Sequence, residues 1–156
     1  MKPPAPRPTL IIDTREPLET ALVFSDAVDT IRACMPEGDY GVRHGDAWLA
    51  LFERKSKDDL VSSLTFERAR FVAECERLAR HPFRAVVVEA PLSDFAGGLY
   101  TSRATPASIV GSIAAIYADF ALPFLFAGSP QGAAFMVEKI VRRLHARAIA
   151  TPETSP

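Results

Sequence analysis

The hydrophobic pattern of this chain changes its period at Ser56. Before that residue, short apolar runs between turn residues predict four strands, at about residues 10–12, 30–34, 40–43 and 47–52. After it, apolar residues recur at helical spacing in four segments, with two further strand-type runs among them, at residues 85–88 and 124–126. Strands followed by alternating helices and strands favour a mixed sheet covered by helices, in the α/β or α+β range.

Local signals mark turns and helix ends. Residues 44–46, with Gly-Asp after a histidine, are typical of a hairpin turn between the third and fourth strands. The first two helices are expected to be separated near Thr65. Thr105 followed by Pro106 predicts a helix start, because Thr caps the first turn and Pro fits the first helical position. The polar face of the last helix carries four basic residues, Lys139, Arg142, Arg143 and Arg147.

The length of 156 residues is that of one ordinary domain with a sizeable core. Residues 1–9 hold four prolines, and residues 150–156 end in a second proline-containing stretch, so we expect flexible tails around a single domain over residues 10–149. No apolar run approaches the ~20 residues that a membrane span needs. The first residues lack the apolar segment of a secretory signal. A cytoplasmic, intracellular protein without a membrane segment is therefore expected.

Composition excludes several classes of protein. Two cysteines, Cys34 and Cys75, are too few for a disulfide scaffold, and no Cys or His pair has the spacing of zinc ligands. No glycine-rich phosphate loop follows a strand, so nucleotide binding through such a loop has no support. The net charge of −1 does not by itself indicate a nucleic-acid-binding protein.

Acidic residues lie where predicted strands begin or end. Asp13 and Glu16 follow the first strand, and Asp39 stands in a turn before the third. Glu53 follows the apolar strand 49–52 directly, and Lys55 comes two residues later. Because side chains alternate along a strand, Glu53 and Lys55 should share one face, and Arg54 should point to the other.

Carboxylates that converge at one end of a sheet repel one another unless a cation joins them. Mg²⁺ is suited to that position, because it takes oxygen ligands and keeps waters that a substrate phosphate can displace. A lysine alongside can position or deprotonate a water, and an arginine can hold the phosphate. The constellation therefore predicts a phosphodiester hydrolase. Taken singly, each acid also fits an ordinary role as a turn residue or as a solvated strand end.

Residues 53–60, with the sequence Glu-Arg-Lys-Ser-Lys-Asp-Asp-Leu, resemble the E-R-K-x-x-x-D signature of the XPF-type endonuclease (ERCC4-domain) family. The resemblance includes residues 12–16 and 38–40 upstream and extends over residues 10–147. This family belongs to the PD-(D/E)xK, restriction-endonuclease-like superfamily. It implies an α/β fold with a mixed central β-sheet flanked by α-helices, dependence on Mg²⁺ or Mn²⁺, and cleavage of branched or distorted DNA in repair or recombination.

The resemblance also implies roles for single residues. Asp39 and Glu53 would bind the metal ion with the backbone carbonyl of Arg54, and Asp13 would complete the acidic cluster directly or through water. Lys55 would position the water. The supporting and DNA-binding roles would fall to the remaining matched residues: Glu16 at the margin of the site, Arg54 and Asp59 as a supporting ion pair, and Arg15 and Arg70 on the DNA phosphates.

Two departures from the family bear on partners. The chain lacks the helix-hairpin-helix domain with which family members grip DNA, so DNA binding is expected to be weak or to depend on a protein partner. Glu74 stands where the family pattern has a glutamine.

A homodimer is expected through the helix at residues 109–120 and the last helix, which carry many apolar residues. The alternative function is a catalytically inactive, DNA-binding scaffold subunit with the nuclease fold.

Overall fold

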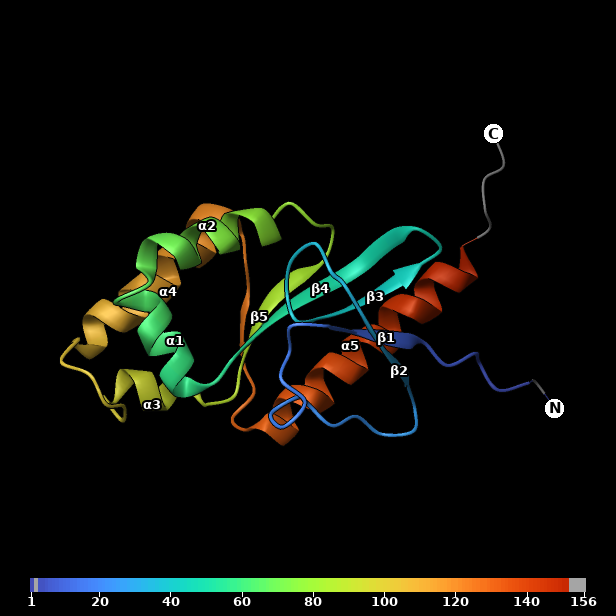
Figure 1. Ribbon diagram of the computed structural model, residues 1–156, viewed down its shortest axis with the longest axis horizontal. Helices are drawn as coiled ribbons and strands as arrows, with labels where there is room; N and C mark the ends of the chain where they lie inside the picture. The colour runs from blue at the N-terminus through green and yellow to red at the C-terminus, as the bar shows by residue number, and fades with distance from the viewer. Residues whose placement is uncertain (2, 152–156) are drawn as a thin grey trace.

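The computed structural model describes residues 1 and 3–151 and contains one six-stranded mixed sheet (Figure 1). The strands lie in the order β2-β1-β3-β4-β5-β6. Their bounds are β1 Thr9–Asp13, β2 Asp29–Ala33, β3 Tyr40–His44, β4 Ala47–Lys55, β5 Arg84–Val88 and β6 Phe124–Phe126. The helices are α1 Lys57–Leu64, α2 Arg68–Leu78, α3 Leu92–Ala96, α4 Pro106–Phe120 and α5 Pro130–Ala150.

Strand directions divide the sheet into two parts. β1 and β2 are parallel, β3 is antiparallel to both β1 and β4, and β4, β5 and β6 are parallel to one another. The hairpin between β3 and β4 turns at Gly45, whose φ of 58° suits glycine. The predicted α/β fold with a mixed central sheet flanked by helices is confirmed.

Helices cover the two faces of the sheet in separate layers. On one face, Leu51 and Val86 pack with residues of α1 to α4 in a first core. On the other face, Phe52 and Val87 pack with Val137 and neighbouring residues of α5 in a second core. In Figure 1, α1 to α4 gather at one end of the sheet and α5 runs along it. Consecutive residues of β4 thus enter different cores, as a period of two requires.

Most predicted helix boundaries are confirmed. The side chain of Thr105 caps α4 by accepting a hydrogen bond from the N–H of Ser108, and Thr65 ends α1. The short helix α3 was not predicted, because five residues give too few apolar positions to show a helical period. No helix in the described part of the chain combines the length and the apolar character of a membrane span.

The expected tails are only partly covered by the structure. β1 already begins at Thr9, and the carbonyl of the preceding Pro8 accepts a hydrogen bond from the N–H of Asp29. At the other end, α5 continues to Ala150, and residues 152–156 of the predicted C-terminal tail lie outside the described residues. The single domain with flexible ends stays a prediction.

Candidate active site

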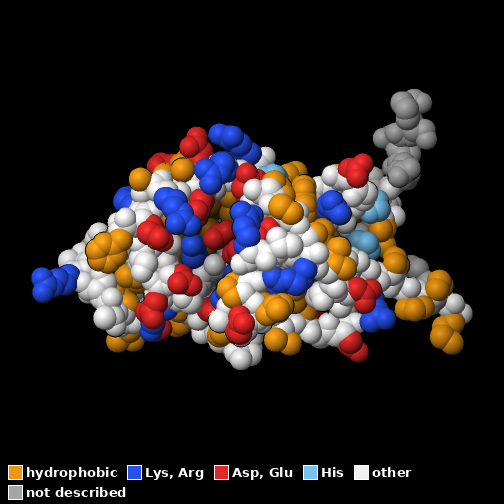
Figure 2. Space-filling model, viewed as in Figure 1, with side chains coloured by type: hydrophobic (Ala, Val, Ile, Leu, Met, Phe, Trp, Pro, Cys, Tyr) orange, Lys and Arg blue, Asp and Glu red, His pale blue; other side chains and the backbone are white. Residues whose placement is uncertain are grey.

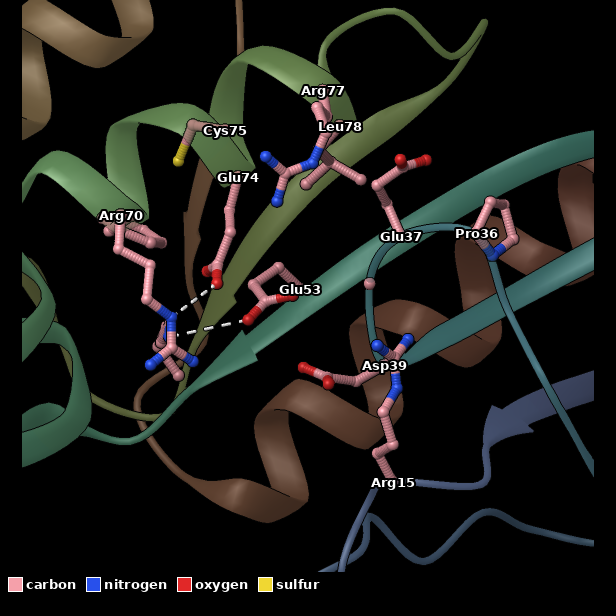
Figure 3. A pocket seen from close by; sticks show the side chains of 13 residues that line it. Arg15, Pro36, Glu37, Asp39, Glu53, Arg70, Glu74, Cys75, Arg77 and Leu78 are labelled. Carbon is pink, nitrogen blue, oxygen red and sulfur yellow. Dashed lines mark hydrogen bonds and ion pairs between the residues drawn. The ribbon is translucent and has the colours of Figure 1, made fainter. Parts of the chain in front are cut away.

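A cavity of about 250 Å³ lies between the end of β4, the loop before β3 and the exposed side of α2. Figure 2 shows acidic and basic side chains gathered around a hollow in this part of the molecule, and Figure 3 shows the side chains that line it. The polar residues of its wall are Arg15, Glu37, Asp39, Glu53, Lys55, Arg70, Glu74 and Arg77.

Asp39 is fixed from both its main chain and its side chain. Its N–H donates a hydrogen bond of 2.7 Å to the carbonyl of Phe52, and its Oδ2 accepts one of 2.8 Å from the N–H of Arg54. The turn that brings it there passes through Gly38, which has a φ of 78°. A Cβ on Gly38 would lie 2.8 Å from the carbonyl oxygen of Phe52, so the close approach of this turn to β4 requires glycine.

Glu53 and Lys55 share the face of β4 that forms the cavity wall, as the strand period predicts. The Nζ atom of Lys55 lies 3.5 Å from Oε1 of Glu53 and 4.9 Å from the ring centroid of Phe71 on α2. Both side chains are largely buried, with exposed fractions of 15% for Lys55 and 20% for Glu53. The ammonium group therefore stands between an acid and an aromatic ring at the edge of the cavity.

Of the carboxyl groups that line the cavity, Asp39 and Glu53 have raised pKa values. Burial raises the pKa of Glu53 to about 8, and the nearby charge of Asp39 adds to this shift, whereas Lys55 opposes it. Burial likewise raises the pKa of Asp39 to about 6, against the hydrogen bond from the N–H of Arg54. Holding both groups ionised is costly without added positive charge, so the pair favours a cation.

The donor set fits a magnesium-type ion with few protein ligands. In residues 1 and 3–151, no group of three or more Asp, Glu, His or Cys side chains is arranged to hold a metal ion. Mg²⁺ is commonly bound by one or two carboxylates together with waters and substrate phosphates. Asp39 and Glu53 provide two such carboxylates in one open cavity.

Comparisons with known proteins agree with this geometry. The family model described as ERCC4 domain matches residues 12–140. The chain belongs to the ERCC4 domain family. The family resemblance expected from residues 53–60 is thereby confirmed. No curated protein matches the chain.

Two of the solved structures that resemble this ERCC4 domain come from one organism. The structure described as XPF from Aeropyrum pernix has a TM-score of 0.67 and 23% identity, and the match covers 92% of this chain and 67% of that one. A second, described as XPF from Aeropyrum pernix in complex with DNA, has a TM-score of 0.68 and 26% identity, covering 96% and 68%. The fold of the ERCC4 domain is thus that of the XPF nuclease.

Arg54 of the ERCC4 signature points away from the cavity, as the strand period predicts. Its guanidinium lies 2.7 Å from Oε1 of Glu16 and 2.9 Å from Oε1 of Glu89, and none of the three side chains is more than 11% exposed. The expected ion pair between Arg54 and Asp59 is not formed: both residues line one hollow, but the guanidinium of Arg54 is engaged by Glu16 and Glu89. Asp59 lies in the first turn of α1, where its N–H donates to the capping hydroxyl of Ser56.

Asp13 lies beside the turn but its carboxylate does not line the cavity. Its oxygens accept hydrogen bonds from the main-chain N–H of Met35 at 2.8 Å and from the Arg15 main chain and guanidinium. These bonds lower the pKa of Asp13, although burial acts in the opposite direction. Asp13 stands at the end of β1, as the strand pattern predicts. That pattern does not reveal that nearby N–H groups and Arg15 bind the Asp13 carboxylate.

Helix α2 contributes Arg70, which was expected at the DNA phosphates, and two further cavity residues, Glu74 and Arg77, to which the sequence analysis assigned no role in the site. Arg70, Glu74 and Arg77 line the cavity and recur at intervals of four and three residues, so they form one stripe of the helix (Figure 3). Nε of Arg70 donates a hydrogen bond of 3.1 Å to Oε1 of Glu74. The helical spacing from Arg70 is the signal that identifies Arg77 as a neighbour of the site.

Proposed function

We propose that this ERCC4 domain is a divalent-metal-dependent endonuclease that hydrolyses phosphodiester bonds in DNA, preferentially in branched or otherwise structured DNA. The observation that carries the proposal is the convergence of Asp39 and Glu53 in one cavity with the ammonium group of Lys55 3.5 Å from Glu53. Membership of the family supports nuclease activity, and the likeness to an XPF structure that contains DNA supports the substrate.

In this mechanism, water attacks phosphorus and the bond from phosphorus to the leaving oxygen of the DNA strand breaks. Asp39 and Glu53 would hold Mg²⁺ or Mn²⁺, with the Arg54 carbonyl as a further ligand. The ion would supply positive charge that stabilises the phosphate as negative charge develops on it. Lys55 orients the attacking water and can exchange a proton with it.

Arginines at the cavity rim would hold the DNA. Arg15 and Arg70 line the cavity and their side chains are exposed by 71% and 74%, so their guanidinium groups are accessible to phosphates. A guanidinium binds a phosphate through two parallel hydrogen bonds. Asp13 contributes to this arrangement through Arg15, whose guanidinium it holds.

A homodimer formed through the C-terminal helices belongs to the proposal. Tyr117 on α4 and Phe135 and Met136 on α5 are exposed apolar residues that such an interface would cover. A protein partner that supplies further DNA binding is compatible with the same surfaces. The enzyme would act inside the cell on DNA, in repair or recombination. Light scattering at micromolar concentration would give a dimer mass, and a monomer mass would contradict this part of the proposal.

The activity is tested with supercoiled plasmid and flap DNA in the presence of Mg²⁺ or Mn²⁺. The native protein is expected to cleave, and Asp39→Asn and Glu53→Gln are each expected to lose at least a hundredfold in rate. Asp46→Asn, which neutralises an acid of the β3–β4 hairpin turn, serves as the matched control and should cleave normally. Cleavage that survives Asp39→Asn or Glu53→Gln would refute the site, and binding without any cleavage would favour the inactive scaffold.

A further inference from the structure

A second hollow lies on the α5 side of the sheet, between residues 5–8 and the C-terminal half of α5. Its volume is about 450 Å³. In Figure 1 the N-terminal segment passes beside this part of α5. Its wall contains the basic residues Arg7, Lys139, Arg142 and Arg143 together with His145. We call this hollow the α5 groove.

The charge of the α5 groove is of one sign. Four side chains of the wall are cationic, and none of the described residues that line it is acidic, in a chain whose net charge is −1. Glu138, on the same helix, is buried and its carboxylate accepts hydrogen bonds from the N–H and hydroxyl of Ser25. Arg7 lies 4.0 Å from Asp29, and both side chains are more than half exposed, which makes this a weak ion pair.

The cations of α5 are spaced along one stripe. Arg142 and Arg143 stand three and four residues after Lys139, so a rise of about 6 Å along the helix axis separates the first from the last. Phosphates of one DNA strand recur every ~3.4 Å along the duplex axis. The stripe therefore spans just under two such steps, which lets its cations contact phosphates of one strand that lie close together, and Arg7 adds a further donor from the opposite wall.

We propose that the α5 groove binds the phosphate backbone of a second segment of the DNA substrate. This inference rests on the proposed function. The catalytic cavity lies against α2, and α2 and α5 cover opposite faces of the sheet, so the groove would take a different stretch of DNA from the one being cut. A branched DNA offers such a stretch in its second duplex arm. The groove would thereby contribute DNA affinity that a chain of net charge −1 otherwise lacks.

The test measures the affinity for flap DNA in EDTA, so that no cleavage occurs, at several salt concentrations. Arg142→Gln/Arg143→Gln should lower affinity about tenfold or more near 0.1 M salt and reduce the slope of log affinity against log salt by about 2, because each lost phosphate contact removes ~0.9. Arg142→Lys/Arg143→Lys should keep the native slope. Arg80→Gln/Arg103→Gln, which removes two exposed charges elsewhere, is the matched control and should also keep it.

Unchanged affinity and slope in the Arg142→Gln/Arg143→Gln variant would overturn the inference, as would an equal loss in the control variant. Failure of the proposed function shows separately as absence of metal-dependent cleavage by the native protein. A urea unfolding curve for each variant verifies that it folds.

Discussion

The main-chain N–H of Arg54 donates a hydrogen bond to Oδ2 of Asp39, with the two atoms 2.8 Å apart. Arg54 lies between Glu53 and Lys55 in β4, so this bond fixes the Asp39 carboxylate beside the two cavity residues of that strand. The site is thus assembled by the backbone of β4 as much as by side chains. Changes that move the turn before Asp39 should disturb the site without altering any charged group.

Gly38→Ala tests this dependence. The new Cβ would lie 2.8 Å from the carbonyl oxygen of Phe52 and must adopt a φ of 78°, so the turn has to shift and Asp39 with it. We expect a loss of stability and a fall in cleavage rate of at least tenfold. Gly45→Ala is the matched control: it has a φ of 58° and open space around its Cβ, so it should cost only about 1–2 kcal/mol of backbone strain. Equal cleavage by both variants would count against the role of the turn.

The raised pKa values of Asp39 and Glu53 predict a pH dependence of stability in the absence of divalent metal. In the folded state these groups bind protons more tightly than in the unfolded state, whose pKa values are the ordinary 3.8 and 4.5. The stabilising contribution is therefore complete below about pH 4 and is lost as pH rises through the folded values of about 6 and about 8.

Glu53→Gln should remove most of the loss of stability that occurs as the pH rises through about 8, the pKa of Glu53 in the folded protein. Urea unfolding between pH 5 and pH 9 in EDTA should show a native protein that loses stability with rising pH and a Glu53→Gln variant that is more stable than native near pH 9. Added Mn²⁺ should stabilise the native protein at that pH and leave the variant nearly unchanged. A native protein and variant with parallel pH profiles would contradict the raised pKa of Glu53.

Lys55→Met should separate catalysis from metal binding. Methionine keeps much of the apolar contact with Phe71 but removes the ammonium group near Glu53. We expect the single-turnover cleavage rate to fall 10²–10⁴-fold, which is the usual contribution of a positioned proton-transfer group. Affinity for Mn²⁺ should not decrease, because a neighbouring positive charge is lost. Lys57→Met, outside the cavity and paired with Asp94, is the control and should cleave at the native rate.

Asp13→Asn distinguishes a ligand from a positioning residue. The Asp13 carboxylate is occupied by the N–H of Met35 and by Arg15, so the variant should lose about 1–3 kcal/mol of unfolding free energy, as expected for hydrogen bonds to a buried charged group. Its affinity for Mn²⁺, measured by calorimetry, should stay within about threefold of native. A loss of metal affinity as large as that of Asp39→Asn would place Asp13 among the ligands instead.

Sequence patterns predicted the parts of this protein that depend on local periodicity. The alternation along β4 placed Glu53 and Lys55 on one face and Arg54 on the other, and Thr105 with Pro106 marked the start of α4. These features follow from backbone geometry that a single segment already determines.

The features that were missed depend on contacts between distant segments. Arg54 pairs with Glu16 and Glu89, which are 38 and 35 residues away, and no local pattern selects them over Asp59. Arg77 reaches the cavity only because α2 packs beside β4. Side-chain partners of this kind are decided by tertiary packing, which periodicity does not encode.

The most direct measurement is anomalous scattering from a crystal soaked with Mn²⁺. We expect an anomalous peak in the cavity, bonded to one carboxylate oxygen of Asp39 and one of Glu53, with Lys55 alongside. If the native protein cleaves DNA with Mn²⁺ while the peak lies elsewhere, Asp39 and Glu53 are not the metal ligands.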